Sequence, residues 1–265
     1  MTVEVAGAFT GRTALVTGAG RGIGRAVALG LADTGADLIL LARSAQQLQA
    51  TRTALAERGA GRGRVTVIVA DLGDQEQRAQ AVAVALARGQ VQILVNNAAT
   101  VEPLGATAEV PASDLRWAFE VNVIAPVALA TAVLPGMIDA GWGRIVNVSS
   151  GIVAHPEAMV RGNAYAATKA ALEAHTLNLA AELHGTGVTA NVYRPGRVDT
   201  AMQEWIRGQD PERIGADLHE RFTCFATSDE LITPERTAAS LLARLGGVQN
   251  GAVWDVDDTG GAMDG

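Results

Sequence analysis

The chain has 265 residues, and its 21 basic side chains against 28 acidic ones give a net charge of −7. Hydrophobic residues make up 48% and aromatic residues only 4%, which predicts a folded core of aliphatic side chains and excludes a wholly disordered chain. The acidic balance, without a basic stripe, argues against a nucleic-acid partner. The single cysteine, Cys224, excludes an intrachain disulfide framework, and the four histidines lack metal-ligand spacing, so we expect no metal.

The sequence pattern gives no sign of a membrane or secretory segment. Residues 1–10 lack the basic and then apolar regions of a signal peptide. No run of 18 apolar residues occurs, so we expect no transmembrane helix and no membrane contact. These features predict a cytoplasmic protein.

Short, β-branched apolar runs alternate with longer stretches of helical periodicity. The expected strands are 12–17, 37–42, 64–70, 91–96, 144–149, 188–193 and 251–256. The expected helices are 22–34, 44–58, 74–88, 113–140, 164–184 and 233–245, with caps at Ser44, Asp74, Ser113 and Thr233. This order predicts the α/β class: one domain over 1–265, with a doubly wound, Rossmann-like parallel sheet and helices on both faces. An irregular insertion at about 199–231 is expected to form a flap over the substrate.

A glycine-rich turn joins the first strand to the first helix. Gly18, Gly20, Gly22 and Gly24 follow Thr17, and such glycines let a pyrophosphate approach the free N–H groups of the helix N-terminus. The spacing differs from the common Gly-x-Gly-x-x-Gly pattern, because Ile23 stands at the third glycine position. We interpret the turn as a dinucleotide site; the alternative is a purely structural turn.

The residues after the second strand indicate which dinucleotide is bound. An acidic residue at this point would hold a ribose 2′-hydroxyl, but the chain has Arg43 and Ser44 there. Arg43, together with Arg21 in the glycine-rich turn, is suited to a 2′-phosphate, which favours NADP(H) over NAD(H). The alternative is that both are solvated surface arginines.

Tyr165 and Lys169 are four residues apart at the start of an expected helix, so both side chains lie on one face. Lys169 is the only lysine among the 21 basic residues, and the chain has only two tyrosines. A nearby ammonium lowers the pKa of a phenol and suits it to general acid–base catalysis. The alternative is a half-buried aromatic residue beside a solvated lysine.

Together these motifs resemble the short-chain dehydrogenase/reductase family over almost the whole chain. The matching segments, in chain order, are the turn with Gly18, Gly22, Ile23 and Gly24; Asp71 and Leu72; Asn97 and Ala98; Asn122; Ser150; Tyr165 and Lys169; and Pro195, Val198 and Thr200.

The resemblance implies roles for these residues. Tyr165 would exchange a proton with the substrate oxygen, Ser150 would hydrogen-bond that oxygen, and Lys169 would hold the nicotinamide ribose. Asn122 would support a water relay, and the other matching residues would bind the cofactor. The resemblance also implies a homodimer or homotetramer, and residues 164–184 carry two apolar stripes, more than one sheet face requires.

The function expected from these residues is carbonyl reductase-like, transferring a hydride between NADP(H) and a ketone, aldehyde or secondary alcohol. Apolar residues in the flap predict that part of this small-molecule substrate is apolar: Met202, Trp205, Ile206, Phe222 and Phe225. His155 and Met159 are either pocket residues or ordinary surface and packing residues. The alternatives are a sugar-nucleotide epimerase or dehydratase and a regulatory protein that senses dinucleotides without catalysis.

Overall fold

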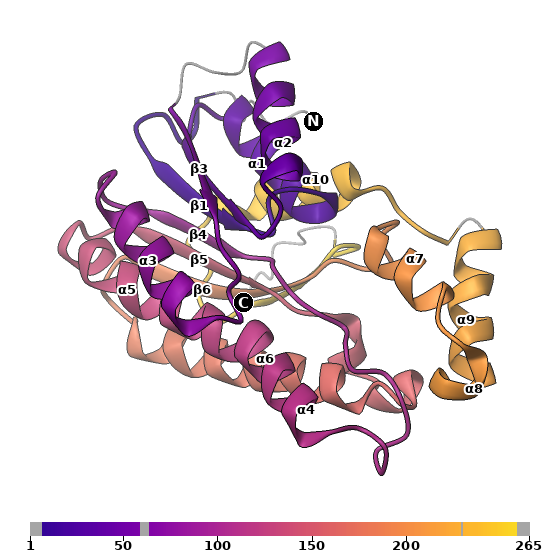
Figure 1. Cartoon of the computed structure of the whole chain (residues 1–265). Helices are drawn as coiled ribbons and strands as arrows, with labels where there is room; N and C mark the ends of the chain where they lie inside the picture. The colour runs from indigo at the N-terminus through magenta and orange to yellow at the C-terminus, as the bar shows by residue number, and fades with distance from the viewer. Residues whose placement is uncertain (1–6, 59–63, 229, 259–265) are drawn as a thin grey trace.

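The computed structural model describes residues 7–58, 64–228 and 230–258. Part of the expectation for residues 1–10, and residue 229 of the expected flap, lie outside this range. A seven-stranded, wholly parallel sheet lies at the centre of the fold, with the strand order β3-β2-β1-β4-β5-β6-β7 (Figure 1). The predicted doubly wound α/β fold is therefore confirmed.

The seven strands all correspond to predicted runs, with small shifts at their ends. They are β1 (Thr13–Thr17), β2 (Asp37–Ala42), β3 (Val65–Val69), β4 (Ile93–Asn96), β5 (Gly143–Val148), β6 (Val188–Arg194) and β7 (Val253–Asp255). The central strands β1, β4 and β5 are buried along nearly their whole length, as expected for strands covered on both faces.

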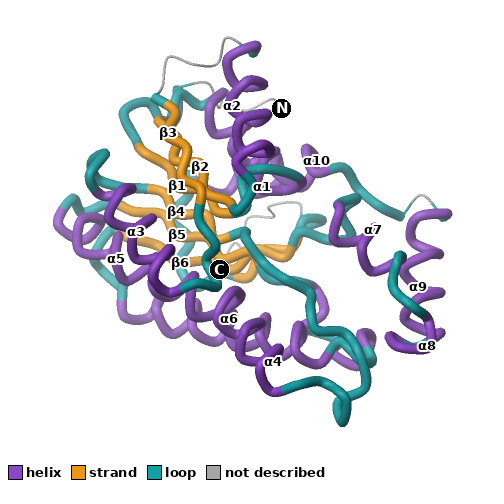
Figure 2. Tube along the Cα trace, viewed as in Figure 1, coloured by secondary structure: helices purple, strands orange, loops and turns teal. Residues whose placement is uncertain are grey.

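Helices cover both faces of this sheet (Figure 2). One layer contains α1 (Gly22–Asp33), α2 (Ala45–Glu57) and α10 (Pro234–Leu245), whose side chains share one hydrophobic cluster with the strands. The other layer contains α3 (Gln75–Leu86), α5 (Ala125–Asp139) and α6 (Asn163–Glu182), which share a second cluster. Because successive side chains of a strand point to opposite faces, neighbouring residues of one strand join different clusters: Leu38 and Leu40 belong to the first, Ile39 and Leu41 to the second.

Three of the four predicted helix caps are confirmed. The side chains of Ser44, Asp74 and Thr233 each accept a hydrogen bond from a backbone N–H in the first turn of α2, α3 and α10. The prediction for Ser113 is wrong, because α4 (Ala112–Phe119) begins one residue earlier and follows Pro111. The fixed backbone of proline sets the entry into this helix without a side-chain cap.

The helix predicted over 113–140 is not continuous. A π-helical turn, Glu120–Ile124, separates α4 from α5. By length and composition, Ala112–Asp139 is the one helical stretch of the described chain that could span a membrane, because an 18-residue window within it has a mean hydropathy of 1.9. Within the fold, α5 packs on β5 and α3, and α4 packs on α6, as helices of a core layer do.

Two short 3₁₀ turns, Gly151–Val153 and Pro156–Met159, follow β5. The predicted insertion at about 199–231 contains three helices: α7 (Ala201–Arg207), α8 (Pro211–Ile214) and α9 (Ala216–Thr227). These helices lie beside the carboxyl ends of the strands, away from both helix layers (Figure 1). A third small hydrophobic cluster joins them to the loops after β4 and β5.

Candidate active site

A cavity of about 1130 Å³ opens at the carboxyl ends of the central strands. It lies between β1 and β4, where the order of the strands reverses direction, and this is the usual ligand site of open α/β sheets. Its walls include all but two of the residues expected in the site: Gly18, Arg21, Gly22, Ile23, Arg43, Ser44, Asp71, Leu72, Asn97, Ala98, Ser150, Tyr165, Lys169, Pro195, Val198 and Thr200. Gly24 and Asn122 lie behind this wall.

The glycine-rich turn leaves space that a side chain would fill. A Cβ atom at Gly24 would lie 2.4 Å from the carbonyl oxygen of Gly18, so α1 packs directly against the turn. Gly22 has a φ of +52°, in the left-handed region that favours glycine. Helix α1 has no side-chain cap, so its first N–H groups are free to meet a pyrophosphate at the cavity wall. This turn fits a dinucleotide.

Thr17 and Asn97 join the turn to the end of β4. The Thr17 hydroxyl oxygen accepts hydrogen bonds from the backbone N–H groups of Asn97 and Ala98, at 2.9 and 3.0 Å. The Asn97 side-chain amide donates to the Thr17 carbonyl at 2.9 Å. These hydrogen bonds hold the glycine-rich turn and the end of β4 together at the cavity wall.

Arg43 lies at the rim of the cavity. Its side chain is 62% exposed, and its Nη1 atom lies 3.8 Å from a carboxylate oxygen of Asp71. An exposed pair at this distance is weak, so the guanidinium remains available to a ligand phosphate. Arg21 is also exposed at the same rim, while Ser44 is engaged as the cap of α2.

Ser150 and Tyr165 lie together in one wall of the cavity. Ser150 follows β5, and its hydroxyl oxygen accepts from the Ile152 N–H at 3.3 Å and so caps the first 3₁₀ turn; Tyr165 lies near the start of α6, and both residues line the cavity. Burial raises the pKa of Tyr165 above 10, and the Ser150 hydrogen bond only partly opposes this. The direction is opposite to the lowering expected from Lys169, because burial of the phenol is the largest effect on its pKa.

Lys169 lies one helical turn beyond Tyr165, with its Nζ atom 5.8 Å from the centre of the phenol ring. Only 2% of the residue is exposed, and its ammonium donates a hydrogen bond to the Val148 carbonyl at 2.8 Å. Burial lowers the pKa of Lys169 from 10.5 to about 8, while the charge of Glu173 raises it. The side chain is therefore a cavity residue and not the solvated surface lysine of the alternative interpretation.

Asn122 is completely buried in the π-helical turn. Its side chain accepts from the Thr100 N–H and donates to the Thr100 carbonyl, both at 2.8 Å, and it also donates to the Thr168 hydroxyl at 3.0 Å. That hydroxyl donates in turn to the Tyr165 carbonyl at 2.8 Å. Asn122 therefore joins the loop after β4 to the first turn of α6 and reaches Tyr165 through Thr168.

The outer part of the cavity has both apolar and polar side chains, the polar ones including Gln203 and Arg221. Four of the five predicted flap residues line it, namely Met202, Ile206, Phe222 and Phe225. Trp205 instead packs in the third hydrophobic cluster behind them. Met159 and His155, whose roles the sequence left open, both reach the cavity wall.

Other cavity residues gave no signal in the sequence. Gln47 in α2, Trp117 in α4, and Val256 and Asp257 near the carboxyl end all line the cavity. Each comes from an element whose approach to the site depends on tertiary packing. Among the described residues, no group of three or more metal-binding side chains occurs.

Comparisons with known proteins show the family of the chain. Residues 12–211 match the family described as short chain dehydrogenase. The chain is 38% identical over 238 residues to a short-chain type dehydrogenase/reductase of Picea abies, covering 83% of this chain and 87% of that protein. It is 37% identical over 198 residues to a short chain dehydrogenase of Pseudocercospora fijiensis, covering 74% of this chain but only 62% of that protein.

A solved structure shares the fold at similar length. It is a 3-oxoacyl (acyl-carrier-protein) reductase from Agrobacterium tumefaciens C58 with NADP bound, at 29% identity and a TM-score of 0.80. The similarity covers 96% of each chain. The family match, together with the cavity at the strand ends, defines an oxidoreductase that uses a nicotinamide cofactor and acts on a small-molecule CH–OH or C=O group. The chain belongs to the short-chain dehydrogenase/reductase family.

Proposed function

We propose that residues 1–265 act as one unit that reduces a ketone or aldehyde with NADPH, or oxidises the corresponding secondary alcohol with NADP⁺. The observation that carries this proposal is that Ser150, Tyr165 and Lys169 share one cavity with the glycine-rich turn. The bound nucleotide would supply or accept the hydride. The remaining chemistry belongs to the side chains of this chain.

In this proposal the neutral phenol of Tyr165 donates its proton to the carbonyl oxygen, or takes it back in the reverse direction. Ser150 donates a hydrogen bond to the same oxygen and thereby orients the substrate. Lys169 holds the ribose hydroxyls of the nicotinamide half. Asn122, as a buried positioning residue, supports the first turn of α6 and a water path from Lys169.

The proposed substrate has an apolar part next to its carbonyl group. The outer wall supplies Met159, Met202, Ile206 and Phe222 from the segments 151–163 and 199–228, which we propose to act as a substrate flap. These apolar side chains favour an aliphatic or aromatic substituent on the carbonyl compound, and Gln203 and Arg221 in the same wall can bind a polar group of it.

A panel of carbonyl compounds tests the proposed function. NADPH oxidation, followed by the loss of nicotinamide absorbance, is expected with aryl or alkyl ketones and to be slower with sugars of similar size. Omitting the carbonyl compound provides the blank. A protein that binds NADPH but consumes none with any ketone, aldehyde or diketone would contradict the proposed reaction.

We expect Arg43→Ala to weaken NADPH binding about tenfold or more and to leave NADH binding nearly unchanged. The loss of one charge-assisted contact to a phosphate costs roughly 1.5–3 kcal/mol of binding free energy. NADH has no 2′-phosphate and makes no such contact, so its binding should not change. Dissociation constants measured by nucleotide fluorescence would show the difference. Arg88→Ala, which removes an equally exposed charge just beyond α3, is the matched control. Equal losses for both nucleotides would refute the phosphate contact.

We also propose that the protein is a homodimer or homotetramer joined through α6. One predicted stripe of this helix is turned outward: Ala170, Ala174, Leu177 and Ala181 are exposed, although Ala166 is buried. Leu115 on α4 and Ile124 at the π-helical turn are also exposed on this helix layer. An exposed apolar surface of this kind indicates a protein contact. Sedimentation at micromolar concentration should give a mass of two or four chains, and Leu177→Arg should lower it; a wild-type monomer would refute the proposal.

A further inference from the structure

The turn after β6 forms part of the cavity wall and lies against the last described segment of the chain. Pro195 and Gly196 line the cavity, as do Val256 and Asp257. Gly196 has a φ of +77°, and a Cβ atom there would lie 2.7 Å from Cγ1 of Val256. The backbone N–H of Val256 also donates to the Arg194 carbonyl at 3.1 Å. The position of the Pro195–Gly196 turn therefore depends on what holds these two segments.

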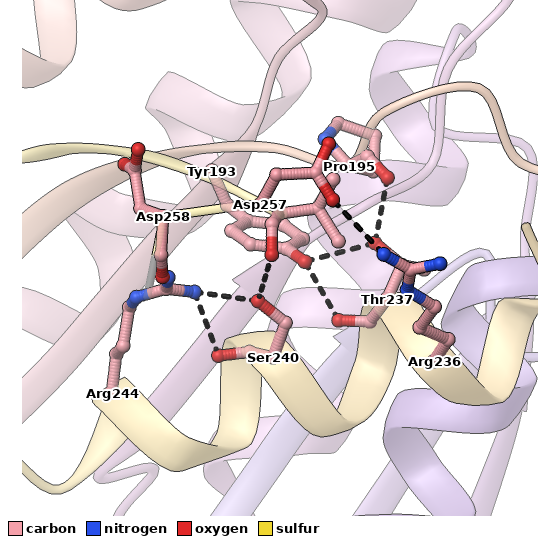
Figure 3. Close-up of polar contacts among 9 residues, drawn as sticks. Tyr193, Pro195, Arg236, Thr237, Ser240, Arg244, Asp257 and Asp258 are labelled. Atoms are coloured by element: carbon pink, nitrogen blue, oxygen red, sulfur yellow. Dashed lines mark hydrogen bonds and ion pairs between the residues drawn. The ribbon is translucent and has the colours of Figure 1, made fainter. Parts of the chain in front are cut away.

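Helix α10 reaches the turn through Tyr193 and Thr237 (Figure 3). Tyr193 on β6 is completely buried, and its hydroxyl oxygen lies 2.7 Å from the Thr237 carbonyl oxygen and 2.8 Å from the Thr237 hydroxyl oxygen. The Thr237 hydroxyl lies 2.8 Å from the Pro195 carbonyl, to which it donates. Because a carbonyl can only accept, the Thr237 proton belongs to Pro195 and the Tyr193 proton is shared between the two Thr237 oxygens.

The same helix also holds the carboxyl-terminal segment. The Ser240 hydroxyl donates to the Val256 carbonyl at 3.0 Å, and Arg236 forms an ion pair with Asp257 at 3.1 Å (Figure 3). Arg244 donates to the Ser240 hydroxyl at 2.6 Å and also to the Asp258 carbonyl. Three successive turns of α10 therefore fasten both segments that meet at Gly196.

We propose that Thr237 is a positioning residue for the nicotinamide nucleotide, because its hydroxyl group holds the Pro195–Gly196 turn where the nucleotide binds. The inference rests on the proposed function, which assigns this cavity to the nucleotide. Among the residues that the structure describes, Thr237 is the one donor that reaches the Pro195 carbonyl. Thr237 is not in the cavity wall, so it acts through the turn and not by contact with the ligand.

Thr237→Val isolates this one hydrogen bond. Valine has nearly the shape of threonine, and the Tyr193 hydroxyl keeps the backbone carbonyl of residue 237 as its acceptor. The Pro195 carbonyl is then buried without a donor, which is costly, so the turn relaxes in the nucleotide-free protein. Binding must draw the turn back into position, and the affinity falls.

Nucleotide affinity and hydrogen exchange, measured on the full chain, test this inference. Thr237→Val is expected to raise the dissociation constants of NADPH and NADH about tenfold. It is also expected to speed amide exchange at 196–200 in the absence of nucleotide. Thr237→Ser keeps the hydroxyl group and should restore both values.

Thr34→Val is the matched control. Thr34 is 1% exposed, and its hydroxyl donates to the Leu31 carbonyl at 2.6 Å at the far end of α1. This variant should lower the melting temperature without changing nucleotide affinity. Unchanged affinity and exchange in Thr237→Val, beside normal wild-type binding, would overturn this inference alone. A wild-type protein that binds neither nucleotide would overturn the proposed function and this inference with it.

Discussion

Tyr165→Phe is expected to lower kcat for carbonyl reduction about 100- to 10,000-fold, the usual range for the loss of a general acid. The variant removes only the phenolic oxygen, and the ring still packs against the apolar cluster of the flap. Affinity for NADPH should therefore remain close to the wild-type value. Single-turnover measurements separate the chemical step from binding, since nucleotide dissociation is measured independently.

Lys169→Arg and Ser150→Ala extend this test to the other two residues. The Nζ atom of Lys169 donates to the Val148 carbonyl at 2.8 Å, and the larger planar guanidinium of arginine cannot place a compact ammonium at that point. The arginine variant should therefore lose both activity and nucleotide affinity, despite keeping the charge. Ser150→Ala should lose activity and keep affinity. A Tyr165→Phe protein with wild-type kcat would show that the proton comes from elsewhere.

Glu173→Gln is expected to destabilise the protein by about 3 kcal/mol, because it leaves a largely buried cation without its main partner. Arg194 on β6 donates two hydrogen bonds to Glu173 on α6, at 2.9 and 2.8 Å. Both side chains are mostly buried, at 17% and 8% exposure. Asp255 lies 3.9 Å from Arg194 and remains as a second carboxylate in the variant. The expected loss of folding free energy is therefore at the lower end of the range for buried pairs. Urea unfolding at fixed protein concentration measures the change.

The double variant Glu173→Leu with Arg194→Met distinguishes a broken pair from a lost contact. Removing both charges leaves no unpaired ion, so the double variant should unfold at a higher urea concentration than Glu173→Gln. If the two variants are equally unstable, the loss comes from packing and not from the unpaired guanidinium. Glu173 also raises the pKa of Lys169, so Glu173→Gln should lower that pKa further below about 8.

The predictable part of the site lies where short sequence patterns determine geometry. Residues four apart on a helix share a face, and this spacing placed Tyr165 and Lys169 in one cavity. The ends of the strands were also predictable, because each apolar run of the sequence ends close to the carboxyl end of a strand. The turn after Thr17 and the pair Asn97 and Ala98 follow two such ends and line the cavity.

The remaining features depend on contacts that no local pattern records. The π-helical turn at Asn122 contains no glycine or proline from which it could be predicted. The hydrogen-bond partners of Asn122 lie 22 and 46 residues away in the sequence. Tyr193 and Thr237 meet across 44 residues. The direction of the Tyr165 pKa shift also depends on burial, which the Tyr–Lys spacing does not state. The start of α4 at Ala112, one residue before Ser113, is a smaller case, because the preceding Pro111 sets the beginning of the helix.

The lone lysine has a consequence for how the protein tolerates aldehydes. Free aldehydes condense with unprotonated primary amines, and exposed lysines are the usual side chains that they modify. Here every other basic side chain of the sequence is an arginine, and Lys169 is only 2% exposed. The folded surface therefore offers aldehydes no side-chain amine with which to form an imine. The one lysine amine lies in the wall of the cavity, so an aldehyde can meet a side-chain amine of this protein only by entering the site.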